Sequence, residues 1–167
     1  MVIGLNLCPF ARSEWERNSV RIHVTQADTA ESLLETLAAE LTYLLDHDKL
    51  ETTLVCHPCV LTEFEDYNQF LDATDAVLLE MKLDGVIQIA SFHPDYRFYG
   101  TEPDDMDNYT NRSPYPMLHL LREDSVEAAI EWHPDAEGIP DSNIKRLNKL
   151  GLEKIQGLLS ACREDSH

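Results

Sequence analysis

Apolar residues recur at the three- and four-residue spacing of an amphipathic helix in two long stretches of the chain. The first stretch is 29–47, where leucines occupy the apolar positions: Leu33, Leu34, Leu37, Leu41, Leu44 and Leu45. The second runs from Phe64 to Met81, and Gly85 suits the left-handed residue just past a helix end. The spacing predicts a helix over each stretch.

Three pairs of residues have the spacing of a capping box, in which an acceptor side chain is followed three residues later by glutamate. The pairs are Asp28 with Glu31, Thr62 with Glu65, and Asp124 with Glu127. The first two pairs stand where the two helical stretches begin. The third pair predicts another helix start near position 124.

Four shorter runs have the composition of β-strands. The run 20–25 alternates apolar and polar residues, whereas 52–57 and 86–92 are more continuously apolar, as strands covered on both faces are. The run 117–122 fits either a strand or a first helical turn, and we favour the strand. An extra strand over 2–7 is left open.

Two short helices, 140–150 and 152–163, are expected to meet at Gly151 and end the chain. The order of elements is then strand, helix, strand, helix, strand, a long loop, strand and three helices. This order predicts one domain over 1–167 of the α/β class, with α+β as the alternative. We expect a four- to five-stranded mixed, partly parallel sheet packed by amphipathic helices, with a helical C-terminus.

The charge balance narrows the set of partners. The 167 residues include 31 acidic and 13 basic side chains, for a formal net charge of -18. Phosphate backbones and anionic membranes bind through Lys and Arg, so we expect neither nucleic acid nor a membrane as a partner. Four cysteines are too few for a disulfide framework in a chain of this length, and the first residues lack the basic start of a signal segment, so we expect a cytoplasmic protein.

The long segment between Phe92 and Pro116 is the main candidate for a ligand site. It contains six aromatic residues, Phe92, Tyr96, Phe98, Tyr99, Tyr109 and Tyr115. Loops of this length are functional or disordered, and the aromatic content argues against disorder. Arg97 and Arg112 have the planar fork that suits a carboxylate or phosphate, with loop carboxylates as alternative partners. Asn111, Tyr96 and Ser113 are candidates to orient the ligand.

Histidines supply candidate acid–base groups. Three His-Pro pairs occur, and proline after histidine favours the end of an element, which is our interpretation for His133. His57 and His93 differ because each follows a predicted strand, at the edge where open α/β sheets bind ligands. Imidazole titrates near neutrality, so His93 and His119 are the candidate general acid or base.

Cysteines supply a candidate nucleophile and a candidate metal site. Cys8 stands before a proline at a predicted helix start, near the same edge of the sheet. A helix N-terminus there would favour the thiolate form of Cys8. The alternative is that Cys8 is a small, buried apolar side chain without a chemical role. Cys56, His57 and Cys59 could form half of a zinc site, but no second ligand pair follows. We therefore predict no cofactor and keep these three residues as weak zinc candidates.

Four segments resemble the successive blocks of a bacterial family catalogued as domain of unknown function 1415. They are GLNLCPFAR, IQIASFHPDYRF, YTNRSPYPMLHLLREDSVEAA and IPDSNIKRLNKLG, and together they extend over nearly the whole chain. The resemblance implies no activity and no site residue. The functional hypothesis therefore comes from the residues alone.

The leading hypothesis is an enzyme of group transfer or hydrolysis that acts on a small anionic metabolite bound by the loop and strand over 92–122. The alternative is a non-catalytic binding or assembly module that uses the aromatic loop as a protein interface, because Tyr and Arg are favoured at such interfaces. The oligomeric state does not follow from the sequence.

Overall fold

A computed structural model describes residues 1–164 of the chain. Its helices are α1 (Ala11–Glu16), α2 (Ala30–Asp46), α3 (Phe64–Glu80), α4 (Glu123–Trp132), α5 (Ile139–Leu150) and α6 (Leu152–Glu164), with a 3-10 helix, η1, at Met106–Thr110. Its strands are β1 (Val20–Val24), β2 (Thr52–Cys56), β3 (Ile87–Phe92) and β4 (Met117–Arg122). From β1 onward the expected order of strands and α-helices is confirmed, as is the strand assignment of 117–122, and η1 lies within the expected long loop.

The four strands form one mixed sheet in the order β1-β2-β4-β3. β1 and β2 are parallel, and β4 runs antiparallel to both of its neighbours. The α/β class with a small, partly parallel sheet is therefore confirmed. Because β2 and β3 both run opposite to β4, their carboxyl ends lie at the same edge of the sheet, beside the start of β4.

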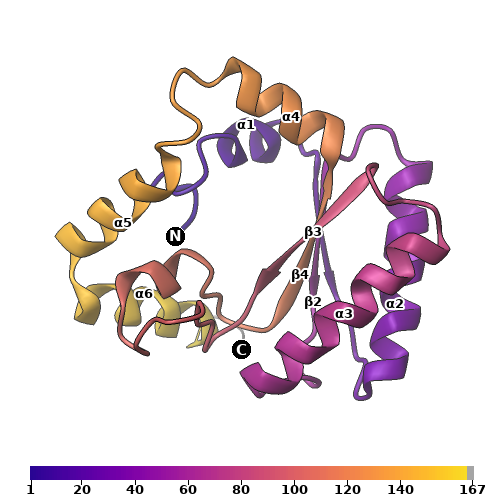
Figure 1. Cartoon of the computed structure of the whole chain (residues 1–167), viewed down its shortest axis with the longest axis horizontal. Helices are drawn as coiled ribbons and strands as arrows, with labels where there is room; N and C mark the ends of the chain where they lie inside the picture. Colours follow the sequence, from indigo (N-terminus) through magenta and orange to yellow (C-terminus); the bar gives the residue numbers. More distant parts are fainter. Residues whose placement is uncertain (165–167) are drawn as a thin grey trace.

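One face of the sheet packs against α2 and α3 and forms the main core (Figure 1). Strand residues alternate between the faces, and Val55, Ile87, Leu118 and Leu120 point into this core. The leucine spacing in α2 directs Leu33, Leu37, Leu41 and Leu44 at the same core, where all four are fully buried. The helical pattern of the sequence thus predicted the packed face of α2.

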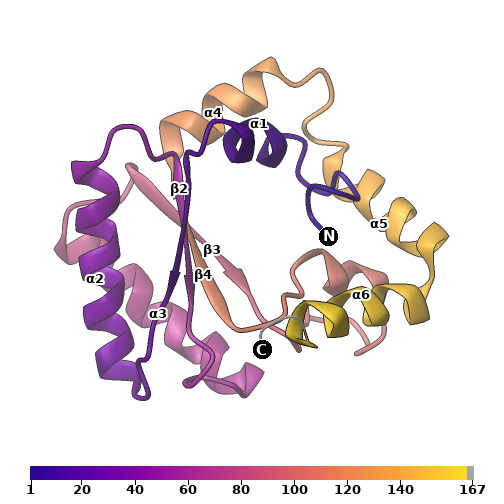
Figure 2. The ribbon, with the colours of Figure 1, turned by 180° about the vertical axis from the view of Figure 1, so that it is seen from behind.

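The other face of the sheet is largely free of such packing. It carries Ile22, Val24, Leu54, Phe92 and His119, and Ile22 and Val24 are 52% and 57% exposed. Within residues 1–164, neither apolar core contains a side chain from this face. Figures 1 and 2 show α1, α4, α5 and α6 arranged in an arc on this side of the sheet.

A second, smaller core joins the N-terminal segment to η1, α5 and α6 through four buried side chains, Leu7, Tyr109, Leu147 and Ile155.

The predicted capping boxes are wrong. At α2 the cap is Thr29, whose hydroxyl accepts from the Ser32 amide 3.2 Å away, while the Ser32 hydroxyl lies 3.3 Å from the Thr29 amide and accepts from it. Glu63 precedes α3 and Arg122 precedes α4, and neither makes a side-chain cap hydrogen bond. The observed caps lie one residue from the predicted ones at α2 and α3 and two residues from it at α4, so the capping-box spacing did not identify the cap.

The end of α3 also differs from the sequence expectation. The residue in the left-handed conformation after the helix is Lys82, with φ of 59°, rather than Gly85. The amides of Lys82 and Leu83 donate to the carbonyls of Leu79 and Leu78, the two bonds of a Schellman motif. Gly85, with φ of 75°, serves the following turn into β3.

The N-terminal segment 2–7 is not a strand. Its amides bond locally, Leu5 to the Met1 carbonyl and Leu7 to the Val2 carbonyl, and Asn6 has a positive φ of 51°. Its apolar side chains pack in the second core, and its backbone does not pair with the sheet.

In the part of the chain that the structure describes, no helix is both long enough and apolar enough to cross a bilayer.

Candidate active site at the carboxyl edge of the sheet

Two histidines meet at the carboxyl edge, around one buried tyrosine. His57 follows β2 and His93 follows β3, and both are fully buried. The ring of Tyr67, from the first turn of α3, lies 5.8 Å from the His57 ring and 5.1 Å from the His93 ring, measured between centroids. The two strands that end here are separated by β4, so Tyr67 is the contact that joins their histidines.

The Tyr67 hydroxyl ties the ends of two strands together. It donates to the Met117 carbonyl over 2.8 Å and accepts from the Phe92 amide over 3.0 Å. Burial raises the pKa of Tyr67 far above its ordinary value, so the hydroxyl stays protonated and keeps both bonds. This phenol is a structural bridge between β3 and β4.

Both nitrogens of His93 are engaged by the backbone. Nδ1 accepts from the Asp95 amide over 3.0 Å, so Nε2 carries the proton and donates to the Leu61 carbonyl over 3.2 Å. Burial lowers the pKa of His93, and the backbone bond to Leu61 opposes that change. A neutral, fully buried ring with two backbone bonds holds the start of the loop in place.

His57 has one unsatisfied nitrogen. Its Nδ1 lies 3.0 Å from the Val60 carbonyl and must donate to it, which leaves a lone pair on Nε2. Among the described residues no hydrogen-bond partner reaches this buried Nε2. Burial lowers the pKa of His57, in keeping with a neutral ring.

Polar side chains within the loop 93–116 mostly bond to the loop itself. Asn108, fully buried, accepts from the Phe98 amide and the Thr101 hydroxyl and donates to the Glu102 carbonyl. Its three bonds, of 2.7 to 2.9 Å, hold the two halves of the loop together. Sequence reasoning missed Asn108, because nothing local shows that its amide is surrounded by backbone.

Two residues predicted to contact ligand also bond within the protein. Asn111 donates from Nδ2 to the Ser91 carbonyl over 3.1 Å, and the Ser113 hydroxyl donates to the Tyr115 carbonyl over 2.6 Å. Backbone bonds between His93 and both residues extend the ladder of β3 and β4 into the loop. Asn111 and Ser113 therefore shape the loop in this structure.

Arg97 and Arg112 come together in one pocket of about 280 Å³ between the loop and the start of α3. Its other lining residues are Glu63, Phe64, Glu65, Asp95 and Pro103. Arg112 stacks on the Tyr109 ring at 4.2 Å and donates to the carbonyls of Tyr96 and Pro103, which leaves three of its five N–H donors. Among the residues that the structure describes, the one polar partner of the Arg97 side chain is Glu65, in a 3.9 Å ion pair, and both side chains are largely exposed.

His119 lies apart from this pocket, on the open face of the sheet. Its Nε2 is 2.6 Å from the Thr52 hydroxyl, which already donates to the Leu120 carbonyl, so Nε2 must carry the proton. The ring also packs near Phe92, with 6.0 Å between centroids. Burial lowers the pKa of His119 to about 4, so the ring is neutral at pH 7.

A family model described as "Protein of unknown function (DUF1415)" matches residues 1–157. The chain belongs to the DUF1415 family. No curated protein and no solved structure matches it. In this DUF1415 chain, the site must therefore be interpreted from its own geometry.

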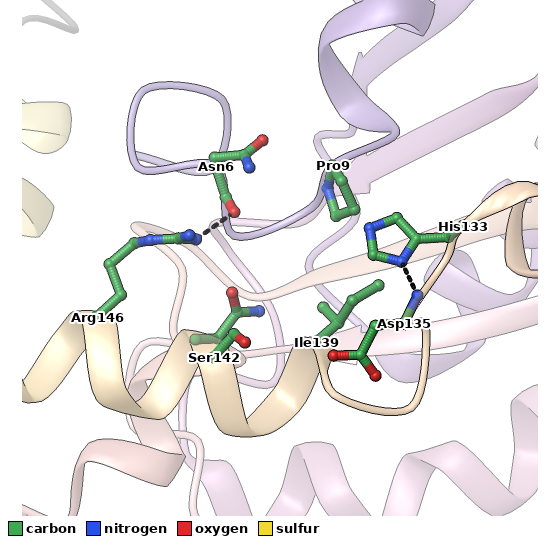
Figure 3. Close-up of a pocket in the computed structure, with 8 residues that line it drawn as sticks. Asn6, Pro9, His133, Asp135, Ile139, Ser142 and Arg146 are labelled. Atoms are coloured by element: carbon green, nitrogen blue, oxygen red, sulfur yellow. Dashed lines mark hydrogen bonds between the residues drawn. The ribbon is translucent and has the colours of Figure 1, made fainter.

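The four segments that resemble DUF1415 blocks gather in two places. Segments 87–98 and 109–129 supply the carboxyl edge, Arg97 and Arg112. Segments 4–12 and 139–151 line a second pocket of about 200 Å³, together with the connection from α4 to α5 (Figure 3). Sequence reasoning missed this second pocket.

Six of its eight lining residues lie in segments 4–12 and 139–151, which are distant in sequence: Asn6, Pro9, Ile139, Ser142, Asn143 and Arg146. His133, interpreted from sequence as the end of an element, and Asp135 complete the lining. The repeated His-Pro pair was the available signal, but only the packing of α5 on the N-terminal segment shows that His133 lines a pocket.

The structure places Cys8 elsewhere than the sequence suggested. Cys8 lies three residues before α1, whose first residue is Ala11, and α1 leads into the amino end of β1. The expectation that Cys8 opens a helix at the carboxyl edge is therefore wrong.

The weak zinc candidates Cys56 and His57 do not face each other. Their side chains point to opposite sides of the sheet at the end of β2, as those of successive residues in extended chain do. The described residues contain no group of three or more metal ligands.

Proposed function

We propose that this protein binds a small metabolite that carries both an anionic and a cationic group, in the pocket between the loop 93–116 and α3. The observation that supports this most directly is the presence of Arg97 and Arg112 in one pocket with spare N–H donors. The chemical groups in the lining are few: two guanidinium groups, three carboxylates and one aromatic wall.

The anionic group would lie between the two arginines. Arg112 is held in place by its stacking on Tyr109 and its two carbonyl bonds, so little conformational freedom is lost when it binds. Arg97 can turn toward the ligand because its ion pair with Glu65 is long and exposed. Carboxylate and phosphate both fit the guanidinium fork.

The cationic group follows from the carboxylates of Glu63, Glu65 and Asp95 in the same lining. Three carboxylates would repel a ligand that carried negative charge alone. A ligand with an ammonium group at its other end would replace that repulsion by attraction. Phe64 supplies an apolar wall between the two charged ends.

Catalysis by group transfer or hydrolysis remains a prediction from the sequence. His93 lies under the pocket against Phe64, with 5.5 Å between ring centroids, but its nitrogens are both bonded to the backbone. His119 lies on the opposite face of the sheet, and its Nε2 is bonded to the Thr52 hydroxyl. The geometry therefore supports binding more strongly than acid–base chemistry.

A ligand screen by thermal shift tests the binding proposal. O-phosphoethanolamine carries both charges, and inorganic phosphate and ethanolamine each carry one of them. We expect the zwitterion to raise the melting temperature and each half alone to have a much smaller effect at equal concentration. Equal effects of phosphate and the zwitterion would contradict the role of the carboxylates.

Arg97→Ala is the informative variant, because within residues 1–163 the Arg97 side chain makes no polar contact beyond an exposed ion pair. We expect it to weaken binding by about tenfold while the free energy of unfolding changes by less than about 0.5 kcal/mol. Lys49→Ala is the matched control: it removes one exposed positive charge just before β2, at the opposite edge of the sheet. If both variants weaken binding equally, the effect is one of net charge and the pocket assignment fails.

A protein interface at the tip of the loop is a second candidate function. Tyr99 is fully exposed and Phe98 is 38% exposed, next to the turn at Gly100. Exposed aromatic side chains of this kind are favoured as interface anchors. We expect Tyr99→Ala to change the solution mass or remove a co-purifying partner if the loop tip is such an interface; an unchanged monomer would exclude it.

We also propose a cytoplasmic location. The thiols of Cys8, Cys56 and Cys59 form no disulfide. Free thiols persist in a reducing compartment. Labelling with a membrane-impermeant thiol reagent on intact and lysed cells tests this: Cys59, which is exposed, should react only after lysis.

A further inference from the structure

The second pocket, of about 200 Å³, shares no residue with the pocket at Arg97 and Arg112. Its walls come from the N-terminal segment, the connection between α4 and α5, and α5 itself (Figure 3). Asn143 donates from Nδ2 to the Leu7 carbonyl and Arg146 donates to the Asn6 carbonyl, both over 2.6 Å. These two bonds hold the N-terminal segment on α5 and form the pocket between them.

His133 presents a hydrogen-bond donor to this pocket. Its Nδ1 accepts from the Asp135 amide over 3.2 Å, so the proton of the neutral ring is on Nε2. The ring packs edge-on against Phe10, with 5.7 Å between centroids, and this contact sets its orientation. In Figure 3 the nitrogen that is not bonded to Asp135 faces the space between Asn6 and Ser142.

Arg146 supplies a positive charge that no carboxylate among the described side chains neutralises. Within the described part of the chain, one of its five N–H donors has a partner, the Asn6 carbonyl. Among residues 1–163, no carboxylate lies within ion-pair distance of its guanidinium group, although the chain has 31 acidic side chains. Ser142, one turn before Arg146 on α5, adds a hydroxyl that makes no hydrogen bond within the same residues.

Asp135 is the one carboxylate in the lining, and it is already used. Its Oδ1 accepts from the Gly138 amide over 3.2 Å, in the turn that leads into α5. Figure 3 shows the carboxylate directed toward that turn, away from the free nitrogen of His133. The groups left to receive a ligand are therefore donors from three separate side chains.

We propose that this pocket binds a small oxyanion, a phosphate or carboxylate group, through Arg146, the Nε2–H of His133 and the hydroxyl of Ser142. Charge complementarity supports this choice, because the pocket offers a guanidinium and neutral donors and its one carboxylate is bonded elsewhere. The bound anion would join α5 to the connection before it and steady the N-terminal segment that Arg146 holds.

The test uses the full chain and two probes, inorganic phosphate and acetate, followed by amide and imidazole NMR shifts. We expect saturable shifts at Ser142, Arg146 and His133 with a dissociation constant in the range of about 1 to 10 mM for the preferred probe. The probe that binds more tightly identifies the anionic group. Shifts at these residues that fail to saturate below about 100 mM of either probe would overturn the proposal.

Matched variants assign the site. We expect Arg146→Gln to weaken binding at least about tenfold, because it removes a charge-assisted bond, and Ser142→Ala to weaken it about threefold. Lys145→Gln makes the same charge change at an exposed neighbouring residue that does not line the pocket, and should leave binding unchanged. Equal losses in Arg146→Gln and Lys145→Gln would overturn the proposal.

Ser142→Ala and Arg97→Ala separate a loss of anion binding from a loss of local structure and from the other pocket. If Arg146→Gln loosens the N-terminal segment, Ser142→Ala still decides the matter, because its hydroxyl bonds to none of residues 1–163; unchanged binding in that variant would count against the site. Arg97→Ala should leave the shifts at Ser142 intact. That comparison separates this pocket from the one at the carboxyl edge, so either proposal can fail without the other.

Discussion

His119 gives the sharpest prediction about stability, because its environment on the open sheet face opposes protonation. Its ordinary pKa of 6.5 falls to about 4 through burial. In the unfolded chain the ring takes up a proton as the pH falls through 6.5, whereas the folded protein resists until the pH approaches 4. The contribution of His119 to stability is therefore complete above pH 6.5 and is lost as the pH falls toward 4.

The size of this loss follows from the change in pKa. A decrease from 6.5 to about 4 corresponds to at most about 3 kcal/mol of unfolding free energy. Burial lowers the pKa of His57 and His93 as well, so the wild-type protein loses stability from all three rings. A variant at His119 is needed to isolate its share.

His119→Gln is suited to this comparison, because glutamine can still donate to the Thr52 hydroxyl but does not titrate. Urea unfolding of both proteins, followed by circular dichroism at several pH values between 7 and 4, gives the difference in unfolding free energy. We expect the advantage of the wild type at pH 7 to shrink, by up to about 3 kcal/mol, as the pH reaches 4.

Leu54→Ala is the control for the loss of packing. Leu54 lies opposite His119 on β2, on the same face of the sheet, and carries no titrating group. Its destabilisation should vary with pH less than that of His119→Gln, because it leaves the titrating ring in place. If the difference between the wild type and His119→Gln is also constant from pH 7 to 4, the proposed desolvation of His119 is refuted.

Three further predictions concern single contacts. Glu40→Gln should cost about 2 kcal/mol in urea unfolding, because the buried carboxylate holds Arg21 through bonds of 2.7 and 3.0 Å; an effect under about 0.5 kcal/mol would contradict this. Asn108→Ala should expose 98–105 to limited proteolysis, and wild-type resistance would show that its three bonds do not order the loop. Tyr67→Phe should cost about 1 to 2 kcal/mol by leaving the Met117 carbonyl and Phe92 amide unpaired; melting at the wild-type temperature would exclude the bridge.

Periodicity predicted most of the fold because burial of an apolar face depends on local spacing. The leucines of α2 show which side of the helix is covered, and the strands β2, β3 and β4 lie within one residue of the runs expected. In β1 the alternation predicted the strand but not its covered side, because Ile22 and Val24 are exposed and Arg21 faces Glu40 of α2. The helix pair at Gly151 was also predictable, since glycine there adopts a φ of 86°. The segment 2–7 failed because its apolar residues pack on α5 and α6, which spacing alone does not reveal.

The site was predictable only in part, because residue type does not show which polar atoms meet. Arg97 and Arg112 do share a pocket, as their place in one loop suggested. Asn111 and Ser113 bond to backbone carbonyls of neighbouring segments, and their local sequence does not indicate those partners. Nothing in the sequence around Arg146 marks it as part of a site, because only the docking of the N-terminal segment on α5 makes it part of a pocket.

Calorimetric titration of O-phosphoethanolamine into the wild type, Arg97→Ala and Glu65→Gln tests the proposed ligand class most directly. Arg97 and Glu65 lie on the two charged sides of one pocket, and both are exposed enough to be replaced without loss of fold. We expect saturable binding to the wild type and a loss of about three- to tenfold in each variant, because each removes one charged contact. Absence of binding across zwitterionic metabolites of this size, or binding that neither variant weakens, would contradict the proposed function.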